Sequence, residues 1–144
     1  MVDKDLIIAK AGAIKKRLSR IASKSQTDIE SFKEDLDSQE IVLFNLQMAI
    51  QDCIDIAAHI ISEKGWGVPG STNEMFYLLE ENDFLNRDLT EKIVKCVGFR
   101  NLLVHAYSRI EVDRVFEIMQ KDIHDLEAYL KSIFNRLSLG LAQK

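Results

Sequence analysis

The sequence predicts an all-α protein, an up-and-down four-helix bundle with one or two additional short helices. Hydrophobic residues make up 47% of the chain and recur at helical spacing, and no stretch alternates between apolar and polar residues as a strand would. The chain holds one Pro and six Gly, too few turn formers for a sandwich or barrel with a turn every ~8–12 residues. Its 144 residues suffice for one core, so residues 1–144 are expected to form a single domain.

Apolar spacing and capping signals give the order of the elements. A capping box is a polar side chain followed three residues later by an acid, and the pairs that fit it are Thr27/Glu30, Asp37/Glu40, Ser71/Glu74 and Asp88/Glu91. We therefore expect helices over residues 4–22, 28–35, 38–63, 72–81, 89–107 and 113–137. Four of these are long and two are short, as in a bundle with small connecting helices.

The segment from Lys64 to Ser71 carries the strongest loop signal, because three Gly and the only Pro surround Trp66. It also spells GxGxxG. A dinucleotide-binding loop of that pattern follows a strand and uses free backbone amides, whereas here a helix precedes and Pro69 has no amide. We therefore interpret the segment as a connection between antiparallel helices, with Trp66 as a hydrophobic anchor rather than a base-stacking residue.

The charge balance excludes a global attraction for nucleic acid or an anionic membrane, since 19 basic and 23 acidic residues leave a net charge of −4. An anionic substrate must therefore be held by a local cluster. The N-terminus is acidic with a short apolar run, and nowhere do 18 apolar residues follow one another, so we expect a cytoplasmic protein without membrane association. Cys53 and Cys96 lack metal-type spacing and are expected to be buried thiols.

The stretch from Cys96 to Tyr107, CVGFRNLLVHAY, is the most informative part of the chain. On a helix its apolar side chains cover nearly the whole circumference, which is typical of a helix packed on most sides. Arg100, Asn101 and His105 interrupt that surface. Since burying an Arg, an amide and an imidazole is costly without partners, the three form either an internal polar network or the lining of a cleft.

Helical geometry does not bring these groups together on one chain. Asn101 and His105 lie one turn apart on one face, Arg100 lies about 140° from His105, and Tyr107 returns near Arg100 two turns along. A second copy of the helix, packed across a two-fold axis, would place two Arg100 and two His105 side chains in one groove. A hydrogen-bonded network inside the bundle explains the spacing equally well.

The motif Arg100-Asn101-x3-His105-x-Tyr107 resembles the RNx3HxY form of the Rx4-6H signature of HEPN domains, specifically that of the HepT-like toxins of toxin–antitoxin pairs. The similarity extends upstream to QDCIDIAAHIISEKG at residues 51–65 and to the Pro69 loop, over roughly residues 40–118. The resemblance implies an all-α, HEPN-like bundle and a homodimer. It also implies a metal-independent ribonuclease without cofactors, whose antitoxin is a cognate minimal nucleotidyltransferase.

The resemblance also implies roles for the residues of the motif. His105 would take the proton of an RNA 2′-hydroxyl, Arg100 would hold the charge that develops on the phosphate, and Asn101 would position one of them. Antitoxins of this family transfer AMP from ATP to the Tyr of the motif, so Tyr107 is the expected AMPylation site. The sequence does not distinguish mRNA from tRNA as the substrate.

A second polar cluster lies on the predicted third helix, where Asp52, Asp55 and His59 share one stripe. Ligands from a single helix make a weak metal site, so we expect no metal and favour a solvated face. Asp52 and His59 also resemble recurring positions of the family and are second-rank candidates for supporting the cleft. His124, flanked by two acids on the last helix, is expected at the surface.

Two other functions stay open at the level of sequence. HEPN bundles also serve as noncatalytic nucleotide- or substrate-binding subunits of nucleotidyltransferases, where Arg100 and His105 would hold a nucleotide or the partner. A structural four-helix dimer would use the polar residues as a buried network. The intact motif favours the ribonuclease.

Overall fold

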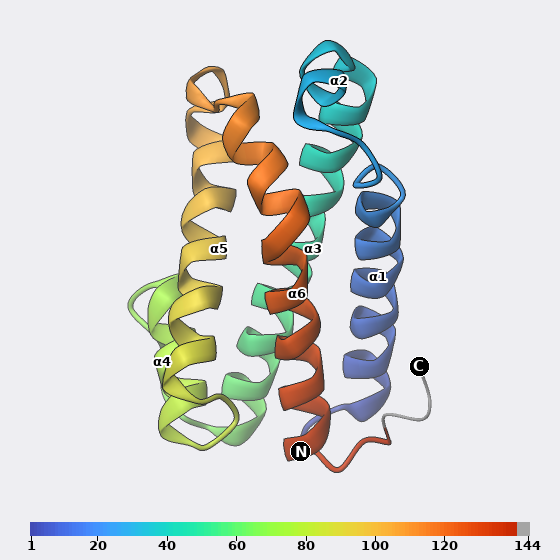
Figure 1. The fold of residues 1–144 in the computed structure, drawn as a ribbon. Helices are drawn as coiled ribbons and strands as arrows, with labels where there is room; N and C mark the ends of the chain where they lie inside the picture. The colour runs from blue at the N-terminus through green and yellow to red at the C-terminus, as the bar shows by residue number, and fades with distance from the viewer. Residues whose placement is uncertain (141–144) are drawn as a thin grey trace.

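The computed structural model describes residues 1–140 and confirms the all-α bundle. Four long helices run up and down in turn (Figure 1): α1 (Lys4–Ala22), α3 (Leu36–Lys64), α5 (Arg87–His105) and α6 (Val112–Arg136). The shorter elements are α2 (Ile29–Glu34), α4 (Thr72–Glu81) and a 3₁₀ turn, η1 (Tyr107–Arg109). Within residues 1–140 the chain forms no strand. The sequence therefore predicted both the fold class and the split into long and short helices.

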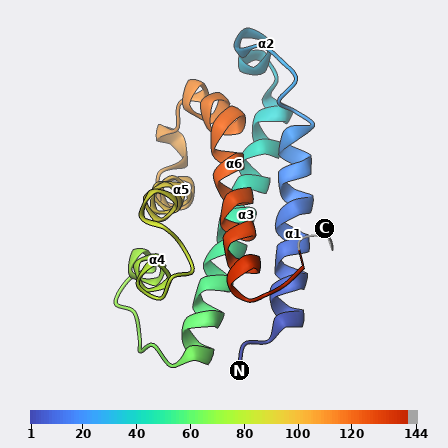
Figure 2. The ribbon, with the colours of Figure 1, turned by 60° about the horizontal axis from the view of Figure 1, so that its bottom comes forward.

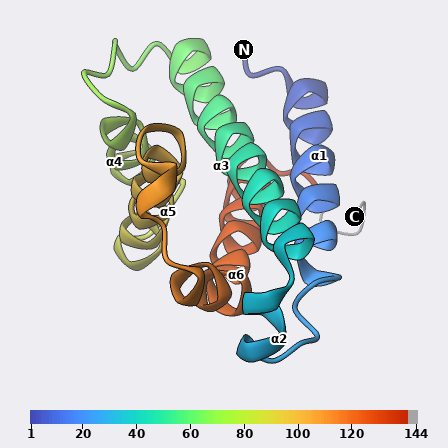
Figure 3. The ribbon, with the colours of Figure 1, turned by 90° about the horizontal axis from the view of Figure 1, so that it is seen from above.

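The central helix of the bundle is α3. It lies between α1 and α5 (Figure 3), and α6 packs against the same group of helices from the other side (Figure 2). Among residues 1–140, α3 alone is long and apolar enough to cross a membrane, but 56% of its most apolar window is buried within the bundle. Packing against the helices that surround it thus accounts for its apolar sequence.

Tyr129 of α6 joins the core to the backbone of α3. Its hydroxyl donates a hydrogen bond to the carbonyl of Cys53 at 2.9 Å, and its ring meets that of Phe76 nearly edge-on. Burial raises the pKa of the Tyr129 hydroxyl well above its ordinary value. Cys53 and Cys96 are buried thiols, as expected, and burial raises the pKa of Cys96 to about 12.

The start of α4 follows the predicted capping box. The hydroxyl of Ser71 accepts the backbone N–H of Glu74 at 3.2 Å, and the Glu74 carboxylate reaches back to the N–H of Gly70 at 2.6 Å. These bonds satisfy N–H groups that a helix start leaves unpaired.

The other three predicted caps are displaced by one or two residues. The residues that cap α2, α3 and α5 are Asp28, Asp35 and Asn86, in place of Thr27, Asp37 and Asp88. Each true cap accepts the N–H of the third residue after it. Several polar residues stand at each of these starts, so the sequence alone offers more than one cap. Packing of the helix decides among them.

The loop after α3 turns the chain without a nucleotide-binding strand. Gly65 ends α3 with a φ of 67°, in the left-handed region that glycine adopts without strain, and the Trp66 N–H closes the turn on the Ile61 carbonyl at 3.2 Å. The Trp66 ring then packs edge-on against Phe84 with 5.6 Å between ring centres. Trp66 is therefore the hydrophobic anchor that the sequence predicts.

Candidate active site

Helix α5 has a buried side and an open side. Its core side is formed by Ile93, Cys96, Val97, Phe99 and Leu103, all buried. Asn101 and His105 are exposed, and Val104 is 43% exposed. Within the single chain α3, α4 and α6 pack against the buried side, and the open side is left without a neighbour among residues 1–140.

Arg100 lies at the edge between these two sides and is half-buried. One terminal nitrogen, Nη2, donates a hydrogen bond to Oε1 of Gln51 on α3, and Nη1 donates to Oδ1 of Asn101 at 3.1 Å. The third nitrogen, Nε, is buried and has no acceptor among residues 1–140. The guanidinium is thus held by two neutral oxygens, and no carboxylate of residues 1–140 pairs with it.

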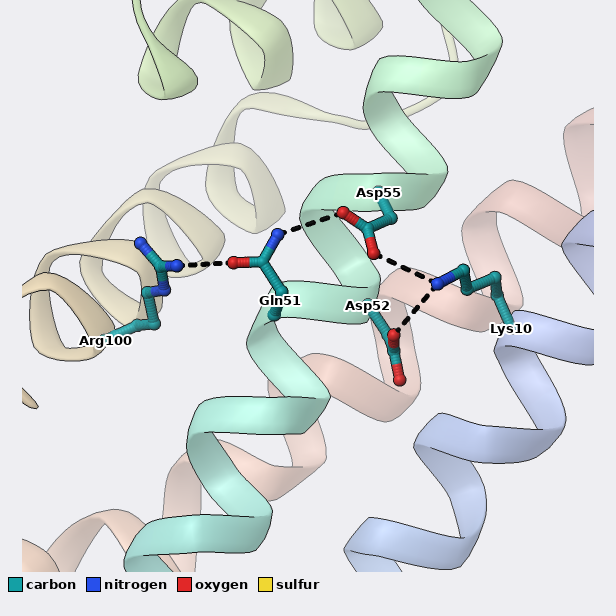
Figure 4. A network of polar contacts seen from close by, with 5 residues as sticks. All are labelled: Lys10, Gln51, Asp52, Asp55 and Arg100. Carbon is teal, nitrogen blue, oxygen red and sulfur yellow. Dashed lines mark hydrogen bonds and ion pairs between the residues drawn. The ribbon is translucent and has the colours of Figure 1, made fainter. Parts of the chain in front are cut away.

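The contacts of Arg100 continue as a chain of polar groups across three helices (Figure 4). Nε2 of Gln51 donates to Asp55 at 2.9 Å, and Nζ of Lys10 on α1 pairs with Asp55 at 3.1 Å and with Asp52 at 3.3 Å. The hydrogen bond to Asp55 is the main reason that the pKa of Lys10 is raised, so the ammonium stays charged. We call these five residues the Lys10–Arg100 network.

His105 is the last residue of α5 and lies one helical turn after Asn101. Both side chains are exposed, so a molecule in solution can reach the imidazole nitrogens. The two groups form an open polar stripe next to Val104. The expected adjacency of Asn101 and His105 is therefore present in the structure.

The helix that we predict to extend to residue 107 ends at His105. Ala106 still donates its N–H to the carbonyl of Leu102 at 2.8 Å, but its φ of −147° leaves the helix. Tyr107 then opens η1, where the N–H of Ile110 bonds to its carbonyl at 3.2 Å. The predicted return of Tyr107 to the face of Arg100 by helical periodicity is therefore wrong. The tight turn toward α6 sets its position instead and leaves it 55% exposed.

The two second-rank candidates have separate surroundings. Asp52 belongs to the Lys10–Arg100 network through its ion pair with Lys10. His59 accepts a hydrogen bond at Nε2 from the backbone N–H of Asp3 at 3.0 Å, so it holds the segment before α1. His124 is exposed, as expected, and its Nδ1 lies 3.2 Å from Glu127.

No group of three or more His, Cys, Asp or Glu side chains within residues 1–140 is arranged to hold a metal ion. Asp52 and Asp55 share the ammonium of Lys10.

Gln51 and Lys10 are members of the network that sequence analysis missed. Gln51 and Asp55 carry a local signal, because they are polar residues four apart on one helix. Lys10 carries none, since its partners lie more than 40 residues away and depend on how α1 packs on α3.

Comparison with known proteins places this site in a family. The model of the family described as Ribonuclease HepT-like matches residues 14–133. The chain belongs to this family. An mRNA nuclease HepT from Shewanella oneidensis is 36% identical over 129 residues, which cover 90% of this chain and 96% of that protein. A tRNA nuclease HepT from Aphanizomenon flos-aquae is 30% identical over 105 residues, which cover 73% of this chain and 69% of that protein.

A solved structure confirms the fold of this HepT-like chain. The tri-AMPylated HEPN toxin of Shewanella oneidensis, in complex with MNT antitoxin, superposes with a TM-score of 0.83 at 35% identity. The match covers 91% of this chain and 98% of the toxin. The expected resemblance to HEPN domains of the HepT type is therefore confirmed.

Proposed function

We propose that this HepT-like protein is the toxin of a toxin–antitoxin pair and cleaves RNA in the cytoplasm without a metal ion. The observation that carries the proposal is the pair Arg100 and His105 at the end of α5, in a chain that is 36% identical to an mRNA nuclease over nearly its whole length. The guanidinium is held without being neutralised, and the imidazole is accessible.

The proposed chemistry uses the substrate's own 2′-hydroxyl as the nucleophile. His105 takes the hydroxyl proton while the oxygen attacks the adjacent phosphorus, and the bond from phosphorus to the 5′-oxygen of the next nucleotide breaks. Arg100 stabilises the negative charge that develops on the phosphate oxygens, and Asn101, which accepts a hydrogen bond from Arg100, helps to orient it. The departing 5′-oxygen takes a proton from water and His105 returns its proton to solvent, so the products are a 2′,3′-cyclic phosphate and a free 5′-hydroxyl.

The cleft of this reaction lies between two copies of the chain in our proposal. Val104 is an exposed apolar residue between the polar side chains of α5, so a second α5 across a two-fold axis would cover it. Such a homodimer brings a second Arg100 and a second His105 to the same groove. The angular separation of the two side chains on one helix then no longer prevents them from acting on one phosphate.

The proposed antitoxin is a minimal nucleotidyltransferase that transfers AMP from ATP to Tyr107. Tyr107 is 55% exposed beside the end of α5, whereas Tyr129 is fully buried and its hydroxyl is occupied by Cys53. An AMP group adds a negative charge and a nucleoside next to the cleft. The added charge would repel the phosphates of RNA, and the nucleoside would block the entry of RNA to the cleft.

The test is cleavage of cellular RNA by purified variants. His105→Ala and Arg100→Ala should each lower the cleavage rate by about 10²–10⁴-fold, since each removes a group acting in the transition state. His124→Ala is the matched control, because it removes another exposed imidazole, on α6. A chelator should leave the rate unchanged. Sequencing of the products identifies mRNA or tRNA as the substrate.

One result would decide for the alternative function. If the parent cuts no cellular RNA, the protein is a noncatalytic nucleotide- or substrate-binding subunit of the nucleotidyltransferase. If instead the parent cleaves and His105→Ala cleaves as well, His105 is not the base and its assigned role is wrong. Circular dichroism of each variant shows whether the helices are intact.

A further inference from the structure

We propose that Gln51 is the positioning residue of Arg100: it fixes the guanidinium through a neutral oxygen and so leaves the positive charge available to a phosphate. The inference rests on the proposed function of Arg100. It concerns the side of the site that faces α3, which the motif on α5 does not include.

The amide of Gln51 has only one orientation that suits its neighbours. Its nitrogen faces the carboxylate of Asp55 at 2.9 Å, and its oxygen faces the guanidinium of Arg100. The reversed amide would set N–H groups against N–H groups on one side and oxygen against oxygen on the other. Asp55 therefore determines which end of Gln51 meets Arg100.

Asp55 is itself held from the opposite side (Figure 4). One of its oxygens accepts from Gln51, and the other pairs with Lys10 at 3.1 Å. Lys10 also pairs with Asp52, so one ammonium fixes two carboxylates of α3. The position of the guanidinium on α5 thus depends on the packing of α1 against α3.

The neutrality of Gln51 matters for catalysis. A carboxylate at this position would bind the guanidinium more tightly, because charge-assisted bidentate pairs are the strong ones, but it would compete with the phosphate of RNA. An amide oxygen uses one N–H of Nη2, and Asn101 uses one N–H of Nη1. The second hydrogen of each terminal nitrogen remains for a phosphate oxygen.

The experiment compares three variants in steady-state cleavage of a labelled RNA. Gln51→Ala should lower kcat/KM by about tenfold, as expected for loss of a hydrogen bond to a charged group. Gln51→Glu keeps an acceptor for Arg100 but neutralises the positive charge of its guanidinium. KM should therefore rise, and the salt dependence of RNA binding should weaken. Gln47→Ala is the matched control, since it removes the same side chain one turn earlier on α3 and should behave as the parent.

A double-variant comparison separates positioning from general stability. If Gln51 acts through Arg100, Gln51→Ala should weaken RNA binding in the His105→Ala protein and should add nothing once Arg100 is also replaced by Ala. Additive losses would show that Gln51 acts by another route and would overturn the inference. Gln51→Met, which keeps the length of the side chain but lacks the amide, provides the same comparison if Gln51→Ala does not fold.

The outcomes distinguish this inference from the proposed function. If Arg100→Ala cleaves RNA as the parent does, the proposed function fails and the inference with it. If Arg100→Ala is inactive while Gln51→Ala and Gln51→Glu both match Gln47→Ala, only the inference is overturned.

Discussion

The three tyrosines of the chain differ in whether an enzyme can reach them. Tyr129 is buried, Tyr77 is 37% exposed with the guanidinium of Arg87 over its ring, and Tyr107 is 55% exposed in η1. Only the last of these stands next to the Arg100–His105 end of α5. Exposure and neighbourhood together make Tyr107 the best acceptor for a regulatory nucleotide.

Replacing Tyr107 by Phe should therefore prevent AMPylation. After incubation with the neighbour-encoded nucleotidyltransferase and ATP, the intact mass of the parent should rise by one or more AMP units, and that of Tyr107→Phe should not. Tyr77→Phe is the control and should be modified like the parent. An adduct mapped to Tyr77, or a mass gain in Tyr107→Phe, would assign the modification elsewhere.

The residues of the motif could be found from the sequence because they lie within one short stretch of one helix. Apolar neighbours surround Arg100, Asn101 and His105 in the sequence, and the spacing of these three residues determines on which side of the helix each one lies. Gln51 and Lys10 could not be assigned in this way, since their roles depend on contacts between helices more than 40 residues apart in sequence. The local pattern thus indicated the groups that we propose to react, and it missed Gln51 and Lys10, which belong to the network that holds Arg100.

At the scale of the element, helix bodies were predicted better than helix ends. Apolar periodicity extends over many residues, whereas a cap depends on one side chain among several polar candidates. The early end of α5 had no signal at all, because neither Gly nor Pro stands between His105 and Val112. The chain leaves the helix there to reach α6.

Helix α6 carries a carboxylate, that of Asp122, which lowers the stability of the folded protein when it is ionised. Burial raises the pKa of Asp122, and the nearby charges of Asp125 and Glu117 raise it further. A carboxyl whose folded pKa is above its unfolded value destabilises the folded state where it is ionised. The free energy of unfolding therefore falls as the pH rises from the unfolded pKa of this carboxyl to its higher folded pKa.

Asp122→Asn should accordingly raise Tm at pH 7, and the gain should vanish well below pH 3.8, where Asp122 is protonated in both states. Thermal unfolding followed by circular dichroism at both pH values measures this difference. Glu40→Gln, at an exposed position of α3, is the control and should change Tm little at either pH. A lower Tm for Asp122→Asn at pH 7 would refute the argument.

At the scale of the whole molecule, the open side of α5 is the surface that we expect a second copy to cover. From the sequence, a charged residue at Leu103 or at Val104 is expected to break or weaken the dimer, but the structure distinguishes the two positions. Leu103 is only 4% exposed and belongs to the core of its own chain, so a charge there would unfold the bundle. Val104 is the residue to change.

Val104→Asp should convert the dimer to a folded monomer. Sedimentation velocity at tens of micromolar gives the mass, and circular dichroism shows that the helices are retained. Val68→Asp, at a position 97% exposed in the loop after α3, is the matched control and should stay dimeric. A parent protein that sediments as a monomer would remove the dimer and the shared cleft together.

The fold as a whole followed from composition because one Pro and six Gly leave little alternative to helices in a chain that is 47% hydrophobic. The order of long and short helices followed from the apolar pattern. The apolar pattern did not predict their arrangement in space, with α3 in the middle. It shows which face of a helix is buried, but it does not show which helix packs against that face.

The single Trp of the chain determines what intrinsic fluorescence can report. Trp66, in the loop after α3, packs on Phe84, which lies shortly before the start of α5. Arg100 and His105 lie near the opposite, C-terminal end of α5. The emission of Trp66 therefore monitors loosening of the corner between α3 and α5 as the protein unfolds, and it is insensitive to events at the cleft. Binding of RNA is best followed with a fluorophore on the RNA, while the emission of Trp66 in the same sample verifies that the bundle is intact.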